Sequence, residues 1–244
     1  MSLYSEFSKY YEETFPLREE VYRFLKSYLP ENGGHVLDLG CGPGHYCGKF
    51  QEDGYTAFGI DLDAEMINTA RKKYPASIFS CMDMTDIDAL HEKFNCIYTI
   101  GNVLAHIPNK TLYTLLPKVK NALHAGGYWI FQVVNWDYLL HLQHYTFPIK
   151  SLAKDTITFH REYETLSEAE VLFRTGMKSG DAFLFEEAVK LYPLRSDSYL
   201  EYHQKAGFDL CGVYADFKKS AFDKNVNSGM VFVFRKPTDL SGGK

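Results

Sequence analysis

The sequence predicts one α/β domain built on a seven-stranded, mostly parallel sheet, with helices on both faces and an antiparallel β insertion after the fifth strand. Short apolar runs alternate with stretches of helical spacing through the first half of the chain, as in parallel sheets covered by helices. A glycine-rich turn follows the first apolar run. A β-rich block at 157–191 interrupts the alternation, which resumes after it.

The elements of the first half follow in order. Apolar residues at helical spacing predict a helix over 16–29, with Pro16 in its first turn. Apolar runs predict strands at 35–39, 56–61, 77–81, 96–101 and 128–134. Helices are expected between them at about 45–53, 64–74 and 109–125. Pro117 should kink or divide the last helix, which Gly126 and Gly127 should end.

In the second half, alternating residues with a turn at 178–181 predict an antiparallel meander. A helix at 196–207 and strands at 208–217 and 229–236 complete the core. The expected organisation is a helical leader and lid at 1–30, a cofactor-binding core at 31–150, an insertion at 151–195, a C-terminal helix and strand pair at 196–237, and a disordered tail at 238–244.

Composition limits the function. The 244 residues are 45% hydrophobic and 23% charged, which fits a soluble globular protein. The net charge is −5 and no basic segment is longer than 71–73, so we expect no nucleic-acid partner. No apolar run reaches the roughly 20 residues that cross a membrane, and no signal pattern starts the chain, so a cytoplasmic location is expected. The cysteines form no CxxC pair, so we expect no metal site.

The most informative segment is VLDLGCGPGHY at 36–46, a strand running into a helix. Gly40, Gly42 and Gly44 let the backbone turn sharply and let a ligand approach it closely. Dinucleotide sites have GxGxxG at this place, with a small residue at the sixth position for helix–strand packing. Here the spacing is GxGxG and that position holds His45. The pattern therefore favours a different nucleotide ligand, although a tight turn alone would also explain the glycines.

Acidic residues follow the next two strands. Asp61 ends the second strand, 23 residues after Asp38, where a carboxylate accepts hydrogen bonds from ribose hydroxyls. Asp83 and Met84 follow the third strand, where an acid and a backbone amide suit an adenine ring. Because these strand ends meet at one edge of the sheet, we predict an adenosine site. The alternatives are that Asp61 caps a helix, although Asp63 is better placed, and that Asp83 is an ordinary loop acid.

With these residues in place, the chain resembles the class I S-adenosylmethionine-dependent methyltransferases, which have a Rossmann-like fold. VLDLGCGPG resembles their first motif, Asp61 with Leu62 their ribose and adenine contacts, and LHAGGYWIF their turn into strand five. The resemblance implies S-adenosylmethionine as cofactor and S-adenosylhomocysteine as product. The cofactor-binding residues that it implies are Asp38, Gly40, Cys41, Gly42, Gly44, Asp61, Leu62, Asp83, Met84 and Gly101.

The leader YSEFSKYYE, the strand-four exit IGNVLAHI and the β insertion before a helix ending in AGF are similar to small-molecule N-methyltransferases. Enzymes that act on nucleotide-linked amino sugars are the nearer match, and glycine-type enzymes a looser one. This resemblance implies a tyrosine and a histidine near the transferred methyl group. The matching positions are Tyr11, with Tyr10 as the alternative in a shifted alignment, and His106.

We therefore predict methyl transfer to a small-molecule acceptor, with an amine preferred. His106 has a suitable intrinsic pKa of about 6.5 for a base, and Tyr11 would orient the amine. Alternatively, His106 only packs and Tyr11 only closes the pocket. O-methylation, a non-catalytic cofactor-binding protein and, more distantly, a nicotinamide oxidoreductase are the competing functions. The insertion is expected to be an acceptor lid or a homodimer contact.

The sequence leaves the role of Arg18 and of one cluster of residues open between two interpretations. Arg18 either meets a carboxylate of the ligand or cofactor, or lies on a solvated helix face. The polar and aromatic residues after strand five either line the acceptor pocket or belong to a segment anchored to the core by leucines. The residues concerned are Trp136, His141, His144 and Tyr145.

Overall fold

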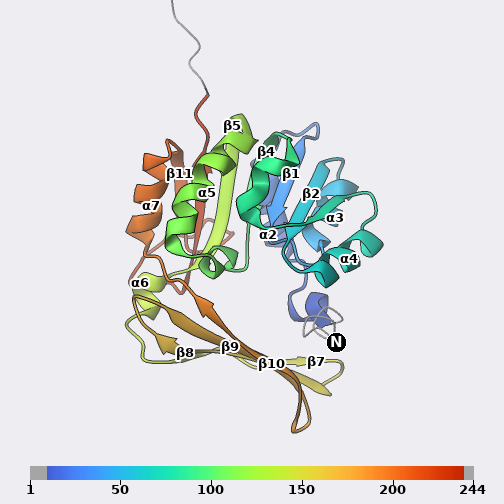
Figure 1. Cartoon of the computed structure of the whole chain (residues 1–244), viewed down its shortest axis with the longest axis vertical. Coiled ribbons are helices and arrows are strands. Elements are labelled where there is room, and N and C mark those ends of the chain that lie inside the picture. Colours follow the sequence, from blue (N-terminus) through green and yellow to red (C-terminus); the bar gives the residue numbers. More distant parts are fainter. Residues whose placement is uncertain (1–9, 239–244) are drawn as a thin grey trace, which may run out of the picture.

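The computed structural model describes residues 10–238 and confirms the predicted Rossmann-like α/β fold (Figure 1). The core is a seven-stranded sheet in the order β11-β12-β5-β4-β1-β2-β3. Its strands are β1 (His35–Leu39), β2 (Thr56–Asp61), β3 (Ile78–Cys81), β4 (Phe94–Thr99), β5 (Leu123–Val134), β11 (Asp209–Tyr214) and β12 (Gly229–Arg235). Strand β12 is antiparallel to both of its neighbours, and the pairings from β5 to β3 are parallel.

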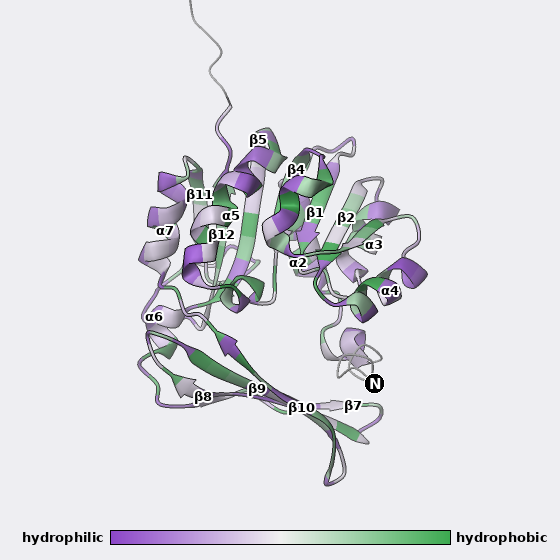
Figure 2. Cartoon of the chain, in the orientation of Figure 1, coloured by the Kyte–Doolittle hydropathy of each residue, from purple (hydrophilic) through white to green (hydrophobic). Residues whose placement is uncertain are grey.

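Helices cover both faces of this sheet because successive side chains of a strand point to opposite faces. Ile97 packs with α5 (Asn109–Ala122), α7 (Ser196–Lys205) and the 3₁₀ helix η1 (Met84–Leu90). Its neighbour Tyr98 packs on the other side, with α2 (Glu19–Lys26), α3 (His45–Glu52) and α4 (Ala64–Lys73). Figure 2 shows hydrophobic central strands between helices whose outer surfaces are hydrophilic. Two hydrophobic cores therefore hold the sheet rigid.

The insertion forms a second, antiparallel sheet of five strands, drawn below the core sheet in Figure 1. Its strands are β6 (Tyr145–Thr146), β7 (Lys150–Leu152), β8 (Ile157–Leu166), β9 (Val171–Ser179) and β10 (Ala182–Leu191). It begins a few residues before the predicted boundary at 151. Phe15 of the leader packs on one end of the sheet, and the short helix α6 (Trp136–Leu139) packs on the other.

The predicted helix at 16–29 is shorter in the structure. Helix α2 begins at Glu19, and Pro16 lies ahead of it rather than in its first turn. Arg18 is extended, with φ −102° and ψ 116°, and its backbone N–H donates to the Tyr46 hydroxyl at 3.1 Å. This bond to a distant side chain gives the N–H of Arg18 a partner outside the helix, which sequence spacing does not reveal. A separate helical turn covers residues 10–14.

The predicted end of the helix at 109–125 is also wrong. Helix α5 is continuous through Pro117, which lies on its exposed face, where water can satisfy the carbonyl that loses its donor. The helix ends at Ala122, and Gly126 and Gly127 belong to β5 instead of ending the helix. A Cβ on Gly127 would lie 3.0–3.1 Å from three carbonyl oxygens, so close packing of neighbouring backbone requires this glycine.

The predictions for residues 1–9 and for the tail at 239–244 lie outside the described residues. Within residues 10–238, no helix is both long enough and apolar enough to cross a membrane.

Candidate active site

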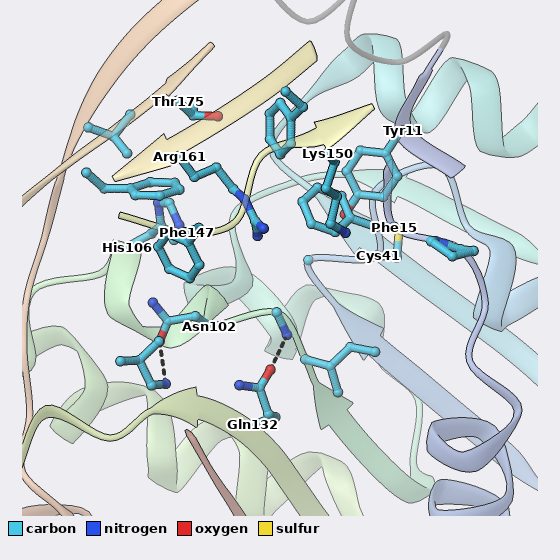
Figure 3. Close-up of a pocket in the computed structure, with 18 of the residues that line it drawn as sticks. Tyr11, Phe15, Cys41, Asn102, His106, Gln132, Phe147, Lys150, Arg161 and Thr175 are labelled. Atoms are coloured by element: carbon cyan, nitrogen blue, oxygen red, sulfur yellow. Dashed lines mark hydrogen bonds between the residues drawn. The ribbon is translucent and has the colours of Figure 1, made fainter. Parts of the chain in front are cut away.

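A cavity of about 570 Å³ lies between the insertion and the edge of the core sheet where β1 and β4 end. The glycine loop after β1, the exit from β4 and the inner face of the insertion all contribute to its walls (Figure 3). Cavities of roughly 300–1,000 Å³ accommodate small molecules. Its place at the carboxyl ends of parallel strands is where α/β sheets bind their ligands.

The glycine loop is built by close packing. Gly40, Gly42 and Gly44 all have positive φ, between 53° and 81°. A Cβ on Gly44 would lie 2.6 Å from Phe79 Cζ, and one on Gly40 would lie 2.8 Å from a methyl group of Val103. Close packing in a tight turn is therefore enough to explain why Gly40 and Gly44 are glycines. A Cβ on Gly42 would lie 3.3 Å from the Tyr11 hydroxyl oxygen, so Tyr11 covers the loop at that point.

Asp61 joins the end of β2 to the glycine loop. Its Oδ2 accepts the backbone N–H of Gly42 at 2.9 Å, and its Oδ1 accepts that of Asp63 at 2.9 Å. Asp63, not Asp61, caps α4, because its carboxylate accepts the first free N–H groups of that helix. A carboxylate has about four acceptor positions, so each Asp61 oxygen can still accept a hydroxyl. Leu62 beside it is 68% exposed and offers an apolar surface.

Asp83 has a structural role at the end of β3. It caps η1, since its Oδ1 accepts both the backbone N–H and the hydroxyl of Thr85 at 2.8 Å. Met84 is the first residue of η1 and packs against the core. These bonds use one carboxylate oxygen, Oδ1, so they are compatible with the predicted adenine contact and do not require it.

Asp38 has an unusual environment at the end of β1. It is 3% exposed, it lines the cavity, and its Oδ1 is buried with no hydrogen-bond partner among the described residues. Burial raises the pKa of this carboxyl group to about 8, the nearby Tyr98 hydroxyl opposes the shift, and the charge of Asp61 adds to it. A buried acceptor without a donor is costly, so this position suits a cationic group of a ligand.

The exit from β4 is held by side-chain hydrogen bonds to the backbone (Figure 3). Gly101 N–H donates to Gln132 Oε1 at 2.8 Å, and Val134 N–H donates to Asn102 Oδ1 at 2.9 Å. Asn102 has a left-handed backbone, with φ 65°. Asn102 and Gln132 line the cavity and were missed in sequence. A lone polar residue inside the apolar run of β5 was the available signal for Gln132.

His106 ends the 3₁₀ helix η2 (Val103–His106), is exposed, and lines the cavity. Surrounding protein removes water from the ring and lowers its pKa below the usual 6.5, so the imidazole is neutral at neutral pH. Tyr11 lies across the cavity from it in Figure 3, beside Cys41 and Phe15. Burial raises the pKa of Tyr11, so its hydroxyl keeps its proton.

The predicted site residues fall into two groups. Those that line the cavity are Tyr11, Asp38, Gly40, Cys41, Gly101 and His106. The others do not line the cavity. They lie in the glycine loop or just after β2 and β3, and they are Gly42, Gly44, Asp61, Leu62, Asp83 and Met84. The structure thus brings the first group together around one space and places Asp61 against it through Gly42.

The insertion supplies lining residues that the sequence did not identify individually. They are Phe147, Lys150, Phe159, Arg161, Tyr163, Phe173, Thr175, Phe185, Glu187, Val189 and Leu191. Arg18 also lines the cavity and pairs with Glu20. The suggested cluster of Trp136, His141, His144 and Tyr145 does not line it. Trp136 is fully buried against Tyr163, so this segment anchors the insertion to the core.

Comparison with known proteins is consistent with this site. Residues 36–127, which contain the glycine loop, Asp61 and Asp83, match a family model described as a methyltransferase domain. YqeM of Bacillus subtilis, whose name gives methyl transfer and no acceptor, is 26% identical over 88% of this chain and 90% of its own length. The ubiquinone biosynthesis O-methyltransferase of Thiobacillus denitrificans is 24% identical over 81% of this chain and 87% of its own length.

Solved structures share the fold at low identity. A Clostridium acetobutylicum S-adenosylmethionine-dependent methyltransferase has a TM-score of 0.77 at 17% identity, covering 97% of this chain and all of its own. CalS10, an amino pentose methyltransferase from Micromonospora echinaspora, has a TM-score of 0.73 at 17% identity and covers 97% of both chains. The sugar N-methyltransferase KedS8 from Streptoalloteichus has a TM-score of 0.72 at 17% identity, covering 97% of this chain and 93% of its own.

The fold, the glycine loop and these matches define a class I S-adenosylmethionine-dependent methyltransferase. Its methyl donor is S-adenosylmethionine. The residues present fit this cofactor. The Oδ1 of Asp38, which has no hydrogen-bond partner within residues 10–238, suits the ammonium group of the methionine part, and the remaining acceptor positions of Asp61 suit the ribose hydroxyls. Leu62 offers the apolar surface that an adenine ring needs.

Proposed function

We propose that this methyltransferase transfers the methyl group to the nitrogen of a small amine, held in the cavity between the glycine loop and the insertion. The observation that carries this proposal is the cavity itself. At about 570 Å³ it has the size of a small-molecule site, and one wall is the cofactor loop while another is lined by aromatic side chains. Apolar walls exclude water from the reacting groups and pack against the acceptor.

His106 is proposed as the base. The bound cofactor supplies an activated methyl group, so the protein has to hold an acceptor lone pair in line with it at roughly 3–3.5 Å. An amine is mostly protonated at neutral pH and has to lose a proton before it attacks. His106 faces the cavity and is neutral there, because desolvation lowers its pKa. Its free imidazole nitrogen can therefore take that proton.

Tyr11 is proposed to position the acceptor. Its hydroxyl keeps its proton because burial raises its pKa, so it can donate a hydrogen bond or accept one from an ammonium. Its ring lies on Gly42, where the leader covers the glycine loop. The leader would thus close the cofactor side of the cavity, and the insertion would close the acceptor side. That role for residues 151–195, in place of a homodimer contact, is part of the proposal.

The second candidate is O-methylation of a small hydroxyl acceptor. The relative named as a ubiquinone biosynthesis O-methyltransferase covers 81% of this chain, and a neutral histidine also suits deprotonation of a phenol. The amine is preferred because the solved sugar and amino pentose methyltransferases match this chain over 97% of its length, insertion included.

Transfer of a labelled methyl group from S-adenosylmethionine to matched pairs of acceptors tests the proposal. The pairs are glucosamine with glucose, and tyramine with 4-ethylphenol, which separate amine from hydroxyl acceptors of similar shape. The proposal predicts label in the amines and little in the hydroxyl partners. Transfer confined to hydroxyl acceptors would replace it with the second candidate. Tight cofactor binding with no transfer to any acceptor of a broad amine and alcohol panel would reject both.

A further inference from the structure

The cavity face of the insertion sheet carries one polar row between two apolar rows. Register pairs Arg161 on β8 with Thr175 on β9, and Thr175 with Glu187 on β10. These three side chains point into the cavity. The rows on either side are Phe159, Met177 and Phe185, and Tyr163, Phe173 and Val189. A polar row in an apolar wall has to be explained, because packing alone would favour apolar residues there.

Arg161 is held among aromatic rings, and the part of the chain that the structure describes gives it no anionic partner. Its guanidinium carbon lies 4.6 Å from the ring centre of Phe147, 5.4 Å from that of Phe159 and 5.6 Å from that of Phe15. Its Nε is buried without a hydrogen-bond partner, and no carboxylate pairs with its side chain within residues 10–238. The rings attract the cation but accept no strong hydrogen bond from it, so its donors remain available.

The arginine on the opposite face of the same sheet does have carboxylate partners. Arg174 on β9 points away from the cavity and donates to both oxygens of Glu164, at 2.6 and 3.0 Å. It also lies 3.6 Å from a Glu186 oxygen. The sheet therefore gives carboxylate partners to the arginine on its outer face and none to the arginine on its cavity face.

A second cation strengthens the positive character near Arg161. Lys150 lines the cavity, and its Nζ donates to the backbone oxygen of Thr14 at 2.6 Å. The Lys150 Nζ lies 4.8 Å from the ring centre of Phe15 and the Arg161 guanidinium carbon lies 5.6 Å from the same centre, so the two cations lie close together. Burial lowers the pKa of Lys150, and the charge of Arg161 lowers it further. Glu187 lies two strands away at the other end of the polar row. An anion entering the cavity is therefore attracted to the Arg161 end.

We propose that Arg161 binds an anionic group of the acceptor, a carboxylate or a phosphate. In Figure 3 its side chain extends from the insertion into the space between His106 and Tyr11. A guanidinium presents paired N–H donors that match two oxygens of either group. The apolar rows beside it would pack the rest of the acceptor. This inference rests on the proposed function, because the acceptor is the molecule that the cavity holds.

Titration calorimetry with simple probes tests the inference without turnover. Phenyl phosphate, benzoate and benzyl alcohol share a ring and differ in the polar group. Each is titrated into the full-length enzyme with and without S-adenosylhomocysteine, for the wild type, Arg161→Gln, Arg161→Lys and Arg174→Gln. The wild type should bind one of the anions at least about tenfold more tightly than benzyl alcohol. Arg161→Gln should remove that preference, Arg161→Lys should keep part of it, and Arg174→Gln should leave it unchanged.

The anion that binds better identifies the group as a phosphate or a carboxylate. Equal affinity of the wild type for the three probes would overturn the inference, as would an anion preference that survives in Arg161→Gln. Weaker binding of S-adenosylhomocysteine to Arg161→Gln, with probe binding unchanged, would assign the side chain to the cofactor instead and also overturn it. Failure of the wild type to bind S-adenosylhomocysteine would count against the proposed function, whereas the titrations without that ligand still test Arg161.

Discussion

The carboxylate of Asp61 accepts the backbone N–H of Gly42 at 2.9 Å, which ties the end of β2 to the middle of the glycine loop. The loop is also bonded to the backbone of β2, since the N–H groups of Gly40 and Cys41 donate to the carbonyl oxygen of Ile60 at 2.8 and 3.0 Å. The glycine loop and the acid that we predict to bind the ribose of the cofactor are therefore positioned as one unit.

Asp61→Ala should weaken S-adenosylhomocysteine binding by roughly 10- to 100-fold, because the variant loses charged acceptors and the tether to Gly42. Asp63→Ala is the matched control. It removes the cap of α4, whose N–H groups from Glu65 and Met66 bond to Asp63 at 2.8 and 2.9 Å. That change should cost about 1 kcal/mol of stability with little effect on affinity. Equal affinities of the two variants, measured by calorimetry, would show that Asp61 does not contact the ligand.

Cofactor binding should depend on pH through Asp38. Burial raises the pKa of this carboxyl group from 3.8 to about 8, so without ligand the group is mostly protonated at pH 7. Because the folded state holds this proton more tightly than the unfolded state, the stability that the group contributes is lost as pH rises from 3.8 towards 8. A cationic ligand group beside it favours the ionised form. Binding of S-adenosylhomocysteine at pH 7 should therefore release about one proton, and the affinity should rise between pH 6 and 8.

Calorimetry in buffers of different ionisation enthalpy measures that proton. Asp38→Asn has a similar shape and no titratable proton, so it should bind more weakly and release none. Proton release that is the same in wild type and Asp38→Asn would place the titrating group elsewhere.

His106→Ala should lower kcat by about 10²–10⁴-fold and leave the affinity for S-adenosylhomocysteine within about twofold. For the wild type, kcat should be flat near pH 7 and fall only below pH 6.5, because desolvation keeps the pKa of His106 below its usual value and the neutral ring is the active form. His91→Ala, at an exposed histidine outside the cavity, is the control. Full turnover in His106→Ala would exclude the residue as the base.

Two glycine substitutions separate backbone strain from steric overlap in the glycine loop. Gly44 and Gly54 both have positive φ, 81° and 88°. A Cβ on Gly54 meets nothing within 4 Å, whereas one on Gly44 would lie 2.6 Å from Phe79 Cζ and 3.0 Å from Ala70 Cβ. Gly54→Ala should cost about 1–2 kcal/mol, and Gly44→Ala at least about 1 kcal/mol more. Urea unfolding measures both, and equal costs would contradict the packing explanation.

The fold could be predicted from local signals. Buried parallel strands are short apolar runs, and VLDLG, TAFGID and CIYTIG all have that form, so the strands and their parallel sheet follow from the alternation with helices. The order of the strands in the sheet came from the structure. The errors fall where a long-range contact decides a boundary. Helix α2 starts late because Arg18 bonds to Tyr46, and Gly126 lies in β5 because its N–H pairs with the carbonyl of Lys236.

The site residues also divide into those that local sequence predicts and those that depend on long-range contacts. The glycine loop and Asp61 are close in sequence to their strands, so spacing predicts them. Arg161 faces the cavity only because of the register of β8, β9 and β10, and a shift of one residue would place it on the outer face with Arg174. Nothing in the local sequence distinguishes these two arginines. Gln132 could have been found as the polar residue in β5, but its bond to Gly101 required the structure.

The most direct test of the account is calorimetric titration of the wild-type chain with S-adenosylhomocysteine. The structure and its comparisons predict one molecule bound per chain, with a dissociation constant in the range of about 1 μM to 1 mM that is typical of enzyme ligands. That binding should weaken in Asp61→Ala and persist in Asp63→Ala. Absence of binding to the folded wild-type protein at millimolar ligand would contradict the account.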